Sequence, residues 1–101
     1  MVDRVPLSPS NTIVLGRLDP KASPHAERPD IDLTPYGALE RGVSRIHARL
    51  ELDDDKLYLT DLHSTNGTFL ADTRLEPDTP TYLPTGSEFL LGRLALQVLF
   101  R

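Results

Sequence analysis

The sequence predicts an all-β fold, a sandwich or a barrel. Its apolar segments alternate apolar and polar residues with a period of two, which is typical of half-buried strands. Nine prolines and six glycines are spread along the 101 residues and leave no stretch with a convincing amphipathic helical face. Many short strands separated by frequent turn signals are typical of β-sandwiches and barrels.

The clearest strands lie in the middle of the chain. Residues 46–52, IHARLEL, alternate strictly, so the apolar side chains share one face and the polar ones the other. Residues 56–62, KLYLTDL, repeat the pattern. The polar run DDDK, residues 53–56, is therefore expected to join the two strands as a hairpin loop.

Further strands are predicted toward both ends. Residues 13–15 form a buried strand that ends at Gly16, and residues 93–100, RLALQVLF, alternate along their length. Two shorter strands, TYL and EFLLG, flank a turn at residues 84–86. We predict no helix, except that residues 38–42 could hold one helical turn.

The chain is long enough for one small domain. Residues 1–10 are predicted to be a tail or linker, and residues 11–101 the domain. Residues 19–29 contain three prolines and are expected to form a mobile surface loop. No apolar run is long enough to span a membrane, and no signal peptide is evident, so we expect neither membrane insertion nor export.

Composition limits the chemistry further. The chain has no cysteine, which removes disulfides and thiolate metal sites and fits a reducing, cytoplasmic location. Its three histidines lie in separate segments, so no metal site and no cofactor are predicted. The net charge of −4 disfavours nucleic acid as a partner. Nine of the eleven basic residues are arginine, which is suited to binding phosphate or carboxylate.

Three polar clusters stand at the ends of predicted strands: Gly16-Arg17, Ser44-Arg45 with the nearby His47, and HSTNGTF at residues 63–69. Taken singly, each has a structural explanation. Arg17 could be a surface residue, and Asn66-Gly67 is a strong signal for a hairpin turn.

Taken together, the clusters predict a site for a phosphate group, because the loops of a sandwich gather at its two ends. A phosphate dianion needs a cation and several short donors, and arginine forks and hydroxyl groups supply them. Arg17, Ser44, Arg45 and Thr65 form such a set. Asn66 carries both a donor and an acceptor and could pair with the backbone of an extended peptide.

These segments resemble the forkhead-associated (FHA) domain, a phosphothreonine-peptide-binding module. The stretch PDIDLTPYGA at residues 29–38 is similar to the form of this loop in bacterial members. The resemblance rests on LGR at 15–17, VSRIHA at 43–48, DLHSTNGTFL at 61–70 and LPTGSEFLLGRLALQVLF at 83–100, in the family's order. It covers most of residues 11–101. It implies a SMAD/FHA-type β-sandwich of about eleven short strands, with the binding loops at one end.

The resemblance also implies a role for each site residue. Arg17, Ser44 and Thr65 would bind the phosphate, and Arg45 would touch the phosphate or the peptide backbone beside it. Asn66 would bind the peptide main chain. The implied structural supports of the site are Gly16, His47 and Gly67.

The implied partner is a phosphothreonine-containing protein or peptide that a Ser/Thr kinase has phosphorylated, or a phosphorylated segment of the protein's own longer chain. Recognition would involve no catalysis, and the isolated domain would be a monomer. The residues that follow the phosphothreonine would be read by residues 39–42. The chain departs from the family pattern at residues 70–75 and 86–88, outside the phosphate pocket.

Two alternatives remain open on the sequence. Ser44, His47 and Asp61 could suggest a hydrolase, but no nucleophile elbow or oxyanion hole accompanies them. The stronger alternative is a phosphate-independent interaction or self-association domain with the same fold.

Overall fold

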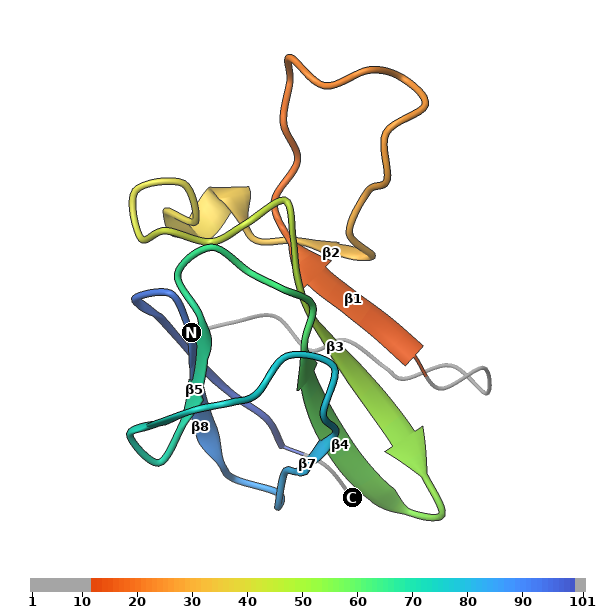
Figure 1. The fold of residues 1–101 in the computed structure, drawn as a ribbon, viewed down its shortest axis with the longest axis vertical. Helices are drawn as coiled ribbons and strands as arrows, with labels where there is room; N and C mark the ends of the chain where they lie inside the picture. The colour runs from red at the N-terminus through yellow and green to blue at the C-terminus, as the bar shows by residue number, and fades with distance from the viewer. Residues whose placement is uncertain (1–11, 100–101) are drawn as a thin grey trace.

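The computed structural model describes residues 12–99, and over this range the chain forms two β-sheets around a common core (Figure 1). The predicted β-sandwich is confirmed. The described residues contain nine strands, where about eleven were expected. The predicted tail at residues 1–10 and the end of the last predicted strand, Phe100, lie outside the described residues.

The first sheet has five strands in the order β2-β1-β3-β4-β7. The strands are β1 (Thr12–Gly16), β2 (Ile31–Asp32), β3 (Ile46–Asp53), β4 (Lys56–Asp61) and β7 (Thr81–Tyr82). β1 pairs with β2 in parallel, and the other pairs are antiparallel.

The second sheet has four antiparallel strands in the order β6-β5-β8-β9. They are β5 (Thr68–Leu70), β6 (Thr73–Arg74), β8 (Glu88–Leu91) and β9 (Leu94–Gln97). One 3-10 turn, η1 (Thr34–Tyr36), follows β2, with Pro35 in its first turn. The sequence did not predict this turn, because three residues are too few to show a helical period.

The core lies between the sheets and draws on both. Leu50 of β3 and Leu59 of β4 are register partners, and both are buried. Phe89 and Leu91 of β8 belong to the same apolar cluster. The alternation seen in the sequence therefore reports burial at most positions, because inward side chains fill the core. His47 and Thr60 are exceptions: they lie on the polar faces of β3 and β4 and are fully buried.

The two turn signals at residues 53–56 and 66–67 have different outcomes. Asp54 and Asp55 both have positive φ, 51° and 65°, and Asp53 pairs with Lys56, so the β3–β4 hairpin is confirmed. The hairpin that Asn66-Gly67 favours when taken alone does not form. The strand before it, β4, lies in one sheet and the strand after it, β5, lies in the other. The segment is a crossing between sheets.

The connections that carry the polar clusters gather at one end of the sandwich. Figure 1 shows the segments after β1, before β3 and between β4 and β5 at the same end, opposite the β3–β4 hairpin. Figure 1 also shows the long β1–β2 connection projecting beyond this end.

Candidate binding site

Hydrogen bonds join the three predicted clusters directly. The backbone N–H of Arg17 donates to the carbonyl of Arg45 at 3.1 Å. The backbone N–H of Thr65 donates to Ser44 Oγ, also at 3.1 Å. The structure therefore brings together residues that are up to 48 positions apart in the chain, counted from Arg17 to Thr65.

Arg17 is positioned by the segment that precedes β3. Its Nε donates to the carbonyl of Val43 at 2.7 Å, and its side chain is half-buried. A guanidinium has five N–H donors, so this bond leaves the two terminal nitrogens for a ligand. The guanidinium is thus oriented before any ligand arrives. Sequence reasoning missed the role of Val43, since a backbone carbonyl has no sequence signal.

Gly16 allows this close approach. The pairing of β1 with β3 shifts register between Leu15 and Gly16, and a Cβ on Gly16 would lie 1.9 Å from the carbonyl oxygen of Arg45. No side chain fits there, because the obstacle is backbone. Gly16 therefore lets β1 press against the residues that carry Ser44 and Arg45.

Ser44 uses its hydroxyl oxygen as an acceptor for the Thr65 N–H. Within residues 12–99 the hydroxyl has no recorded acceptor of its own, so its proton remains available. Thr65 is exposed beside it. Thr65 and the Ser44 hydroxyl are therefore neighbours, although they come from different connections.

His47 is fully buried and uses both ring nitrogens for backbone groups. Its Nδ1 accepts from the Ser44 N–H at 3.0 Å, and its Nε2 lies 2.9 Å from the carbonyl of Gly67. This pairing requires the neutral tautomer with the proton on Nε2. Burial lowers the pKa of His47, against the opposing effects of the Gly67 carbonyl and the charge of Asp61.

These contacts argue against the Ser-His-Asp alternative. His47 meets the backbone of Ser44 and not its hydroxyl, so it is not placed to take the hydroxyl proton. The carboxylate of Asp61 binds other hydroxyl groups, those of Ser64 and Thr68. The three side chains do not form a nucleophile–base–acid chain.

Asp61 instead anchors the segment between β4 and β5. Its buried carboxylate accepts from the hydroxyls of Ser64 at 2.5 Å and Thr68 at 2.7 Å, and from the Ser64 N–H at 3.2 Å. Ser64 Oγ in turn accepts from the Gly67 N–H. A buried carboxylate with several donors is well stabilised, and here it shapes the loop that presents Thr65 and Asn66.

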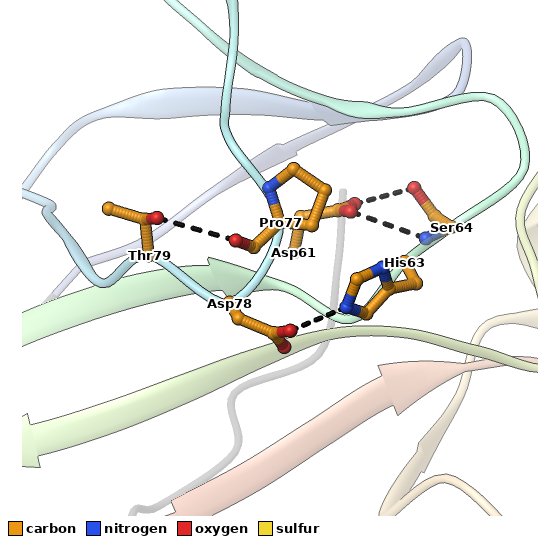
Figure 2. A network of polar contacts seen from close by, with 6 residues as sticks. All are labelled: Asp61, His63, Ser64, Pro77, Asp78 and Thr79. Atoms are coloured by element: carbon orange, nitrogen blue, oxygen red, sulfur yellow. Dashed lines mark hydrogen bonds and ion pairs between the residues drawn. The ribbon is translucent and has the colours of Figure 1, made fainter.

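Figure 2 shows this anchor beside a second one. His63, with a left-handed φ of 58°, reaches Asp78 through Nε2 at 2.5 Å. The N–H of Asp78 also donates to the carbonyl of Asp61 at 2.9 Å. Residues 77–79 are therefore tied to the base of the β4–β5 loop by backbone and side chain.

Asn66 lies at the edge of the site and is exposed. Its Nδ2 donates to the carbonyl of Gly42 at 2.9 Å, which orients the amide. Beside it is a hollow of about 580 Å³, lined by Arg41, Gly42, Asn66, Phe69, Leu90, Gly92 and Arg93. The hollow includes part of the segment 39–42 that the sequence suggested for reading ligand residues.

Arg45 is exposed, and its Nη1 lies 3.8 Å from Asp19 Oδ2. The start of the β1–β2 connection is held by Asp32, whose Oδ1 accepts from the N–H groups of Leu18 and Thr34 and from the Thr34 hydroxyl. Burial raises the pKa of Asp32, but these hydrogen bonds outweigh it and hold the pKa below its ordinary value.

The fold and the site define a class of protein: a β-sandwich that presents arginine and hydroxyl groups from converging loops at one end. The comparisons make this specific. The family model for the FHA domain matches residues 13–92, and the chain belongs to this family. Within the described residues, no helix has the length and apolar character needed to span a membrane.

Relatives by sequence include the protein FraH from Nostoc sp., which is 35% identical over 65 residues, 64% of this chain and 22% of FraH. The nuclear inhibitor of protein phosphatase 1 from Homo sapiens is 38% identical over 63 residues, 60% of this chain and 18% of the inhibitor. The chain thus spans about a fifth of the length of the curated relatives it matches.

Solved structures agree with the fold. The solution structure of an FHA domain from Arabidopsis thaliana superposes with a TM-score of 0.69 at 30% identity, covering 92% of this chain and 70% of that one. A structure from a study of phosphothreonine-dependent FHA domain interactions gives a TM-score of 0.67 at 24% identity, covering 91% and 79%.

Proposed function

We propose that the chain is a binding module for phosphothreonine-containing peptides or proteins, and that it recruits a partner phosphorylated by a Ser/Thr kinase. The observation that carries the proposal is the convergence of Arg17, Arg45 and the hydroxyls of Ser44 and Thr65 at one end of the sandwich. Membership of the FHA family, with a relative studied for phosphothreonine-dependent interactions, supports the proposal.

In this proposal the phosphate takes the donors that the fold leaves unused. A phosphothreonine brings about −1.5 to −2 charges and three acceptor oxygens. The terminal nitrogens of Arg17 meet one side of it, and the proton of Ser44 Oγ meets another. Arg45 and the Thr65 hydroxyl complete the set. Gly16, His47 and Gly67 support the site without touching the ligand.

The peptide main chain is assigned to Asn66. Its Nδ2 donates one hydrogen bond to the carbonyl of Gly42. The second Nδ2 hydrogen and the side-chain oxygen of Asn66 can therefore pair with an extended peptide. Charge-assisted hydrogen bonds contribute about 1.5–3 kcal/mol each, and ordering the peptide offsets much of this. We therefore expect micromolar dissociation constants, about −8 kcal/mol in binding free energy.

The test is calorimetric titration with one peptide, selected from a phosphothreonine-oriented library, in phosphorylated and unphosphorylated forms. We expect binding of the phosphorylated form only. Equal affinity for both forms would support the phosphate-independent interaction domain instead.

Two variants test the site assignment. Arg17→Ala and Ser44→Ala should each abolish measurable binding at micromolar peptide while the protein stays folded. Lys56→Ala removes one positive charge at the start of β4, in the β3–β4 hairpin opposite the site, and should bind as the parent does. Undiminished binding by Arg17→Ala would contradict the assignment of Arg17 to the binding site.

A further inference from the structure

A carboxylate of the protein itself already faces one of the proposed phosphate-binding residues. Asp19 Oδ2 lies 3.8 Å from Arg45 Nη1. Asp19 Oδ1 accepts from the Lys21 N–H at 2.9 Å, so the local backbone of the β1–β2 connection orients the carboxylate. Asp19, Arg45 and Arg17 line one hollow of about 320 Å³.

The geometry distinguishes two roles for Asp19. A carboxylate that positions an arginine makes short, often bidentate bonds to it. Here the separation of 3.8 Å is too long for a hydrogen bond, and the Arg45 side chain is 55% exposed. The contact is an attraction between charges in a hydrated setting, so it satisfies Arg45 weakly and leaves its orientation free.

A phosphate dianion would displace such a contact. It carries more charge than a carboxylate, and its oxygens can approach a guanidinium to hydrogen-bond distance. The Asp19 carboxylate would then lose its partner and face a second negative group across the same hollow. Both effects act against binding.

We propose that Asp19 is a built-in competitor for Arg45, which lowers the affinity of the site for phosphate below what its donors alone would give. This inference rests on the proposed phosphate-binding function. It assigns to the β1–β2 connection a role in setting affinity, through a residue that the phosphate need not touch.

The test uses a defined probe, N-acetyl-O-phosphothreonine N-methylamide, titrated into the full chain and followed by the backbone amide signals of Ser44 and Thr65. Asp19→Asn removes the charge, and its side-chain oxygen can still accept from Lys21. Since an exposed ion pair is a modest attraction, we expect the dissociation constant to fall by about two- to fivefold.

Glu27→Gln is the matched control. Glu27 lines the same hollow, carries the same charge, and has no ion pair among the residues the structure describes. Its change in affinity should be clearly smaller than that of Asp19→Asn. An equal gain from both variants would show a general charge effect and would overturn the competitor role.

A double-mutant cycle isolates the pair. In an Arg45→Ala background, Asp19→Asn should no longer improve binding by the same factor, because the partner it competes for is gone. An undiminished gain in that background would contradict the proposal.

Failure of the inference and failure of the proposed function give different results. If the parent binds the probe and Asp19→Asn binds equally or more weakly, the competitor role is overturned and phosphate binding stands. If neither protein binds the probe, both are overturned. If only Asp19→Asn binds, the competitor role is supported in its strongest form.

Discussion

Ser64 and Thr65 are neighbours in the chain and have opposite surroundings. The Ser64 hydroxyl is buried, donates to Asp61 and accepts from Gly67. The Thr65 side chain is exposed, and among residues 12–99 only the backbone N–H of Thr65 has a partner, the Ser44 hydroxyl. Two adjacent hydroxyls therefore serve different purposes: one shapes the loop, and the other is presented by it.

This contrast predicts different effects of removing each hydroxyl. Ser64→Ala should destabilise the protein by about 1–3 kcal/mol, because Asp61 and Gly67 each lose a buried partner, and it should also weaken peptide binding. Thr65→Ala should weaken binding and leave the unfolding free energy nearly unchanged. Urea unfolding and peptide titration of both variants measure this. Equal destabilisation by the two changes would contradict it.

His47 gives a prediction in pH. Its pKa in the folded protein lies below the ordinary value of 6.5, so the unfolded chain takes up the proton first as the pH falls. Its contribution to stability is therefore complete above about pH 6.5 and declines as the pH falls toward the folded pKa. The proton would also remove the acceptor that Nδ1 offers to Ser44.

Nitrogen-detected NMR of the histidine side chains tests this directly. We expect His47 to show a proton on Nε2 and none on Nδ1 at neutral pH, and a titration midpoint below 6.5. A midpoint at or above 6.5, or a proton on Nδ1, would contradict the assigned hydrogen bonds.

At the scale of elements, the end of β1 lies in close contact with the segment before β3, and this contact positions Arg17. The register shift at Gly16 brings the two backbones together and sets the N–H of Arg17 against the carbonyl of Arg45. The Arg17 side chain then lies along the same segment, on Val43. The pairing of β1 with β3 therefore also places the side chain of Arg17.

Gly16→Ala should disturb that arrangement. The added methyl would meet the Arg45 carbonyl, and relief requires movement of backbone that carries the site. We expect a loss of about 1–3 kcal/mol in stability and weaker phosphopeptide binding. Thr12→Ala, at the exposed start of the same strand, is the control and should change neither. A Gly16→Ala protein with parental stability and affinity would contradict the role of the close contact.

At the scale of the whole molecule, the net charge and the charges of the proposed phosphate-binding residues have opposite signs. The chain carries a net charge of −4, yet Arg17 and Arg45 stand together at the loop end. The site therefore offers two guanidinium groups to a phosphate on an acidic protein, although Asp19, Glu27 and Asp32 line the same hollow. Attraction of a phosphate dianion to the guanidinium groups is partly screened by salt.

Raising the ionic strength from about 0.05 M to about 0.5 M should weaken phosphopeptide binding by several fold. The reason is that the Debye length falls to a few ångströms, so charges farther apart than this no longer attract the phosphate strongly. Calorimetry at the two salt concentrations measures the change, and the midpoint of thermal unfolding serves as the control for folding. Affinity independent of salt would show that charge contributes little to recognition.

The sandwich class, most of its strands and the family were predictable from the sequence, and the roles of the site residues stay predictions. Alternation over residues 46–52 and 56–62 reports burial locally, and the motifs around Arg17, Ser44 and Thr65 identify the family. The shared acceptor of Ser64 and Thr68, Asp61, was not predictable from a local pattern.

The tertiary structure alone decided which segments meet. Asn66-Gly67 has the signature of a hairpin, yet the strands beside it belong to different sheets, because strand pairing depends on the whole core. The contacts of Arg17 with Val43 and of Asp19 with Arg45 likewise join positions that are 26 residues apart in each case. Sequence patterns record the environment of each residue, whereas the partner of a backbone carbonyl or an exposed carboxylate depends on how the chain is folded.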